Sequence, residues 1–108
     1  MSHLPYRYQS PTGDVISFDF PLHDQTGSAM RVHQLLDRIL GVLNHEVGLL
    51  GDTQNGDLLQ ALAMALAVRT ELIRADPEFT HRLARELTNQ ALSALPEARH
   101  ERAQVGHA

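Results

Sequence analysis

The sequence predicts an α+β fold, predominantly α, in which an N-terminal β-hairpin packs on a three-helix unit. Near the N-terminus, apolar and polar residues alternate with the period of a half-buried strand, and from residue 29 onward the apolar residues recur at helical spacing. The chain has 108 residues, of which 43% are hydrophobic and 20% charged. This composition is that of one globular domain, which we expect to span residues 1–96.

The hairpin is expected over residues 6–20. Its alternating side chains are Tyr6, Tyr8, Ile16, Phe18 and Phe20. Pro11 and Gly13 lie between the two runs, where proline presets the first turn position and glycine adopts the left-handed backbone of a bulged three-residue loop. Pro21 then ends the second strand. Because an isolated hairpin is marginal in water, it must lie on the helices or pair an edge with another strand.

Three helices are expected, at about residues 29–46, 58–74 and 77–95. Ser28 is suited to cap the first of them. Asp76 and Pro77 form a strong start signal for the third, and Pro96 stops it. The remaining residues, 97–108, have little apolar surface to bury, so we predict a frayed or disordered tail.

The second and third helices are predicted to form an antiparallel αα-hairpin, because their connection is very short. Placing residues at about 100° intervals gives each helix a broad apolar arc. The residues predicted to form the core are Leu36, Ile39, Leu43, Leu62, Leu66, Val68, Leu83 and Leu87.

Three charged residues lie in or beside these apolar arcs and are predicted to be buried or interfacial. Arg69 falls in the middle of the apolar half of its helix, Glu46 falls inside an apolar arc, and Glu86 lies at the edge of one. An unpaired buried charge is costly, so we expect Arg69 to reach solvent or to meet a carboxylate. Glu86 is the nearest candidate within the chain, whereas Glu46 would need a second copy.

The apolar arcs are wider than one small chain needs, which predicts a homodimer, the commonest oligomer. Four residues are predicted at the interface: Leu49 and Leu50 in the connection after the first helix, and Met64 and Ala67 on the weakly polar face of the second. The competing interpretation places all four in ordinary contacts within the chain.

Several chemistries lack support in the sequence. There is no cysteine, which excludes disulfides, thiolate metal sites and cysteine nucleophiles. His33 and His45 do not share a ligating face, and the stretch 52–57 lacks the glycine and glutamate positions of a calcium loop. The sequence contains no glycine-rich phosphate loop and no pair of carboxylates on one helix face that would suit acid–base catalysis. We therefore expect no metal and no cofactor, and a non-enzymatic protein rather than an enzyme.

One alternative is DNA binding through the third helix. Its exposed side offers five residues that can contact phosphates or bases: His81, Arg82, Arg85, Asn89 and Gln90. Asp76 and Glu78 at the end that would enter the groove argue against it, as does a net charge of −4. A third possibility is a small enzyme or metal protein whose site forms between subunits.

The function favoured by elimination is a small intracellular interaction or regulatory protein. It would act as a homo-oligomer together with a protein partner. The start of the chain lacks the basic and apolar stretches of a secretory signal, and the most apolar segment, 58–73, is too short to span a bilayer. We therefore expect a cytoplasmic protein without membrane contact.

Overall fold

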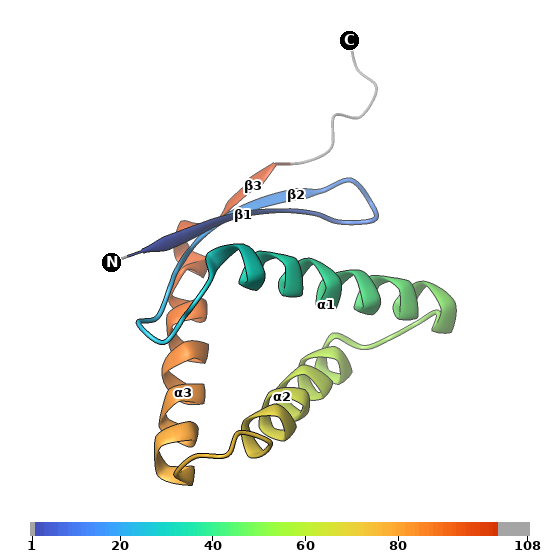
Figure 1. Ribbon diagram of the computed structural model, residues 1–108. Helices are drawn as coiled ribbons and strands as arrows, with labels where there is room; N and C mark the ends of the chain where they lie inside the picture. The colour runs from blue at the N-terminus through green and yellow to red at the C-terminus, as the bar shows by residue number, and fades with distance from the viewer. Residues whose placement is uncertain (1, 102–108) are drawn as a thin grey trace.

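The computed structural model describes residues 2–101 and confirms the α+β, mostly helical architecture (Figure 1). An antiparallel sheet with strand order β1-β2-β3 is combined with three α-helices and one short 3₁₀ helix. In chain order the elements are β1 (His3–Gln9), β2 (Val15–Pro21), α1 (Ala29–Leu50), α2 (Asn55–Glu71), α3 (Pro77–Ser93), η1 (Leu95–Glu97) and β3 (Arg99–Glu101).

The hairpin closes as the sequence predicts. Gly13 donates its N–H to the carbonyl of Ser10 at 2.9 Å, and Ser10 donates to the carbonyl of Asp14 at 2.8 Å. Gly13 has a φ of 93°, the left-handed conformation that favours glycine. Pro21 ends β2, because a proline cannot continue the ladder. The two strands are longer than expected and pair from His3 with Pro21 to Gln9 with Val15.

Alternation divides the sheet into two different faces. Tyr6 pairs with Phe18, and the residues on this side are buried or half-buried against the helices. The opposite side carries exposed ion pairs, such as the one between Arg7 and Glu101 at 3.8 Å. β1 contacts α1, and β2 contacts α3. The hairpin therefore lies on the helices, which is the first of the two predicted alternatives.

The second alternative, pairing of an edge, also occurs, through a strand that the sequence did not predict. Val15 pairs with Glu101 and Ser17 with Arg99, so β3 covers part of the outer edge of β2. The prediction of a frayed tail from residue 97 is therefore wrong for 97–101, which form the end of η1 and β3. This polar segment has few apolar side chains to bury, but its backbone N–H and C=O groups find hydrogen-bond partners in β2. Residues 102–108 of the predicted tail lie outside the described residues.

The helix bounds differ from the prediction at four ends. α1 continues to Leu50 because Gly51, with a φ of 82°, accommodates the left-handed end of the helix. α2 begins and ends three residues earlier than predicted, at Asn55 and Glu71. α3 ends at Ser93, and the turn that follows it is the 3₁₀ helix η1. The predicted caps are correct: Ser28 accepts from the N–H of Arg31, and Asp76 from that of Glu78.

The three helices enclose an open triangle rather than a closed bundle (Figure 1). α2 contacts α3, as the predicted αα-hairpin requires, but the two helices diverge away from their connection. Among the described residues the buried apolar side chains are only Tyr6, Val15 and Ala94.

The predicted core is therefore wrong for the single chain. All eight residues are intermediate or exposed, and Ile39, Leu66, Val68 and Leu87 are each more than a third exposed. The physical reason is the open arrangement: apolar arcs bury their side chains only when another element covers them.

The glycines of α1 provide a test of this backbone. Gly41→Ala should raise the free energy of unfolding by about 0.5–1 kcal/mol, because a methyl group meets nothing within 4 Å and alanine favours the helix. Gly51→Ala should lower it by about 1 kcal/mol, because the φ of 82° strains an L-residue. Urea denaturation at one fixed protein concentration measures both. Equal effects of the two substitutions would contradict the left-handed end of α1.

Candidate interaction surface

An apolar groove lies between the hairpin, α1 and α3. Its volume is about 440 Å³. The hairpin and the segment after it contribute Leu4, Phe20 and Leu22, and α1 and α3 supply the two walls. The lining residues of the helices are Val32, Leu35, Leu36, Ile39, Leu87 and Ala91. The groove thus combines residues from both ends of the chain and exposes them to solvent.

Polar contacts hold the hairpin on one side of α1. The hydroxyl of Tyr6 donates to Asp37 Oδ1 at 2.7 Å, and Asp37 Oδ2 lies 3.4 Å from Nδ1 of His33. The His33 ring packs edge-on against the ring of Tyr6, with centroids 5.2 Å apart. Two turns further along α1, Asn44 Nδ2 donates to the hydroxyl of Tyr8 at 3.0 Å. These bonds fix which face of α1 the sheet covers.

A second contact fixes the segment after β2 on α3. Nε2 of His23 lies 2.8 Å from Oε2 of Glu86, and the histidine side chain is only 13% exposed. This contact joins residues 63 positions apart in the sequence. It closes one end of the groove, because His23 also lines it. Neither this contact nor the Tyr6–Asp37 bond was predicted, since nothing in the local sequence pattern relates such distant residues.

The contact to Asp37 alters the acidity of Tyr6. Burial, the hydrogen bond to Asp37 and the negative charge of that carboxylate together raise the pKa of Tyr6 to about 12. The neutral phenol is therefore the form that the folded protein stabilises. Because the folded pKa exceeds the ordinary value of 10, this contribution is complete below pH 10 and is lost as the pH rises toward 12.

Along α1 runs an exposed apolar stripe, and its N-terminal half also lines the groove beside the hairpin. Its positions follow alternating spacings of three and four residues, the pattern of a helix that packs along another helix. The positions are Val32, Leu35, Ile39, Val42, Glu46 and Leu49. The apolar members are between 36% and 68% exposed. Asp37 and Asn44, which bind the hairpin, lie on the opposite side by helical spacing. We call these six positions the α1 stripe.

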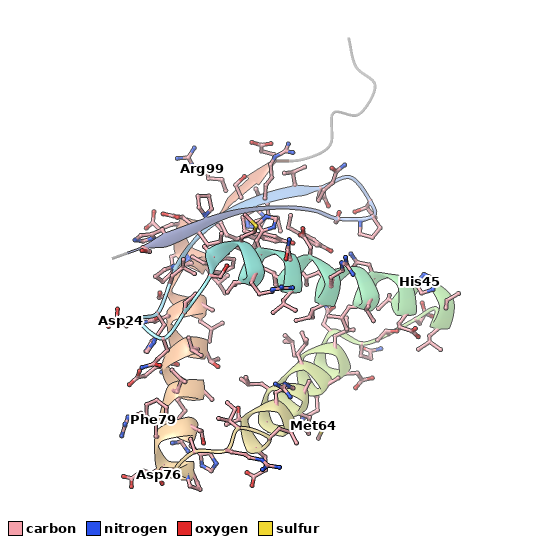
Figure 2. All side chains as sticks on the ribbon, viewed as in Figure 1. Asp24, His45, Met64, Asp76, Phe79 and Arg99 are labelled. Atoms are coloured by element: carbon pink, nitrogen blue, oxygen red, sulfur yellow. The ribbon has the colours of Figure 1, made fainter. Side chains whose placement is uncertain are left out.

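α2 has apolar residues on more than one side. Ala67 lines a hollow of about 340 Å³ together with His81, Ala84 and Arg85 of α3. Met64 lies on the outer surface of α2 (Figure 2) and is 58% exposed. Val68, one turn further on, is 60% exposed. The two predicted interface residues of this helix are neighbours on its surface, because they are three residues apart: Ala67 lines the hollow beside α3, and Met64 lies next to it.

The predicted interface residues are open to solvent in the single chain. Leu49 and Leu50 are 68% and 75% exposed, and they belong to the end of α1 rather than to a connecting loop. Met64 and Ala67 are also exposed. The competing interpretation, that all four are covered within the subunit, does not hold. Their role at an interface stays a prediction.

The three singled-out charges are exposed in the single chain, and the structure does not bring them together. Glu86 pairs with His23 rather than with Arg69. Arg69 has no carboxylate within ion-pair distance in the described part of the chain. Of the two outcomes expected for this side chain, the structure therefore shows exposure to solvent. Glu46 lies within the α1 stripe, where its charge interrupts an otherwise apolar row.

Four of the five residues of the DNA-binding alternative are exposed, and only Gln90 is not. His81 and Arg85 line the hollow between α2 and α3, while Arg82 lies over the ring of Phe79 at 5.8 Å. Gln90 is half-buried, and its Oε1 is buried without a hydrogen-bond partner in the described residues. Asn89 is exposed. Recognition of DNA by this helix remains an untested prediction.

Two further searches concern residues 2–101. In this part of the chain no three histidine or acidic side chains gather in a way that would hold a metal ion. No helix within it has both the length and the apolar character needed to cross a bilayer. Comparisons with protein-family models, with curated proteins and with solved structures found no match for this chain.

The Tyr6–Asp37 contact can be tested by ultraviolet titration of tyrosinate. Tyr6 should ionise with a pKa of about 12, and Asp37→Ala should shift this toward 10, because the acceptor and its negative charge are removed. Tyr8→Phe leaves Tyr6 as the only tyrosine and gives an unambiguous signal. An unchanged Tyr6 titration in the Asp37→Ala protein would show that the two side chains are not in contact.

Proposed function

We propose that the chain is a small non-enzymatic interaction or regulatory protein that acts as an obligate homodimer and, in that form, serves a protein partner. One observation carries the proposal. Seventeen large apolar side chains are exposed in the described residues, while three apolar residues are buried. A monomeric protein rarely leaves contiguous apolar surface of this extent in water, so the surface favours a role in association.

The exposed area supports a second copy as the molecule that covers it. The chain exposes 8773 Å², whereas a monomer of 12.0 kDa exposes about 6,000 Å². The eight residues outside the described part account for at most about 1,300 Å² if fully extended. An excess of roughly 1,500 Å² remains. Obligate homodimers bury about 1,000–2,500 Å² per chain, so one copy of equal excess is a sufficient partner.

The distribution of the exposed residues also supports association of helices. They lie on α1, α2, α3 and the turns that follow α2 and α3. The outer face of the sheet is different, because it carries ion pairs such as His3 with Asp19 at 3.4 Å. Pro5 and Arg7 lie on the free edge strand, and proline and charge at an edge oppose strand-to-strand association. The proposed dimer therefore forms through its helices.

The non-enzymatic part of the proposal rests on the sequence, which has no cysteine and no glycine-rich phosphate loop. A protein partner is part of the proposal because a dimer presents each remaining surface twice, which increases its avidity for a partner with two matching sites.

The proposal is tested by light scattering of the purified protein over a range of concentrations. The expected mass is twice 12.0 kDa, with no folded monomer on dilution to the micromolar range. A folded protein of 12.0 kDa at all concentrations would overturn the proposed homodimer.

Substitutions in the α1 stripe should separate the subunits. Val42→Glu and Leu49→Glu each place a charge where apolar contact is expected, and each should raise the dimer dissociation constant at least 100-fold. Gln34→Glu is the matched control, because it adds the same charge to an exposed position of α1 outside the stripe. Sedimentation equilibrium provides the measurement. Equal effects of Gln34→Glu and Val42→Glu would exclude the stripe as the cause.

A further inference from the structure

We infer that the dimer is formed by two antiparallel α1 helices, with the C-terminal half of α1 from each copy seated in the groove of the other. This inference rests on the proposed homodimer and specifies which surfaces meet. It depends on the spacing of the α1 stripe, on the position of Glu46 and on the place of the groove.

The spacing of the α1 stripe suits a helix of the same kind. From Val32 to Leu49 the stripe spans 18 residues, whose 17 steps of 1.5 Å give a rise of about 25 Å. Side chains that repeat at spacings of three and four residues pack into the gaps between the same side chains of a second helix. Val32 and Ile39, which are β-branched, alternate with Leu35. Two copies of one stripe are thus self-complementary, as a two-fold axis requires.

Glu46 selects the antiparallel direction. Parallel helices in register would bring Glu46 against Glu46 of the second copy, and like charges facing each other in an apolar contact are strongly unfavourable. With antiparallel helices centred on Ile39, Glu46 lies opposite Val32 of the other copy. Arg31 lies beside that position and forms no ion pair within the described part of its own chain.

The helix ends complement this arrangement. The first turn of α1 contains no acidic residue, and its last turn contains no basic residue. The positive end of each α1 dipole is therefore without a carboxylate from its own helix. In the antiparallel pair, Glu46 of the second copy approaches this end and interacts favourably with both the dipole and Arg31.

The groove accounts for two exposed residues in the C-terminal half of α1. Val32, Leu35 and Ile39 form one of its walls, so a helix packed antiparallel on the α1 stripe enters the groove with its C-terminal half. That half carries Val42 and Leu49, which are 62% and 68% exposed. Each copy thereby covers the part of α1 that the sheet and α3 of the same chain leave open.

Cross-linking tests the arrangement, because the natural chain has no cysteine. Ile39→Cys should react with Ile39→Cys of the second copy through a short bismaleimide, since the two residues lie at the two-fold axis. Leu49→Cys should not react with itself, because twenty residues of helix, about 30 Å, would separate the pair. Met64→Cys on the uncovered face of α2 is the comparison for an interface through that helix.

The outcomes separate this inference from the proposed function. Cross-linking of Ile39→Cys alone supports the antiparallel pair. Cross-linking of both α1 variants indicates parallel helices, and cross-linking of Met64→Cys alone indicates pairing through α2. Either result, in a protein that light scattering shows to be a dimer, overturns the inference and leaves the proposed dimer intact. A monomer overturns both.

A charge exchange tests the role of Glu46 without cysteine chemistry. Glu46→Arg and Arg31→Glu should each raise the dimer dissociation constant about tenfold, because each places like charges opposite one another. The double variant restores the opposite charges and should recover most of the affinity. Arg38→Glu, also on α1, is the matched control for a charge change alone. Additive losses in the double variant would overturn the predicted contact between Glu46 and Arg31.

Discussion

The attachment of the hairpin to one face of α1 is the constraint on which the rest of the arrangement depends. Tyr6 binds Asp37 and packs on His33, and Tyr8 binds Asn44 two turns further along. Together these contacts align the hairpin with the helix and cover one side of α1. The α1 stripe lies opposite Asp37 and Asn44 by helical spacing and stays exposed, with its N-terminal half lining the groove beside the hairpin. The open apolar surface is thus a direct consequence of where the hairpin binds.

The connections between helices add to this openness. Gly51 ends α1 in the left-handed conformation, and the extended residues that follow carry the chain away before α2 begins. At the other end of α2, Asp76 and Pro77 start α3 at once, so the two helices meet at their connection and diverge beyond it. A closed bundle would have buried the leucines of all three helices within one chain. The triangle instead presents them to solvent, where the second copy of the proposed dimer would cover them.

Polar contacts at the rim give the groove a defined shape. His23 and Glu86 hold the segment after β2 on α3, and β3 covers part of the edge of β2. These contacts hold the groove walls in place before any partner binds. A preorganised groove loses less conformational entropy on association than a flexible one, which favours a specific dimer over unspecific aggregation.

The sequence alone determined the types of element, the turn at Gly13, the caps at Ser28 and Asp76 and the excess of apolar surface on the helices, because each depends on local backbone preference or on periodicity. It also identified Glu46 as a charge within an apolar row. Only the tertiary structure decided that Leu66 and Val68 are exposed, that Glu86 binds His23 rather than approaching Arg69, and that residues 99–101 form a strand. These outcomes depend on which faces meet, and helical periodicity shows that a face needs covering without specifying what covers it.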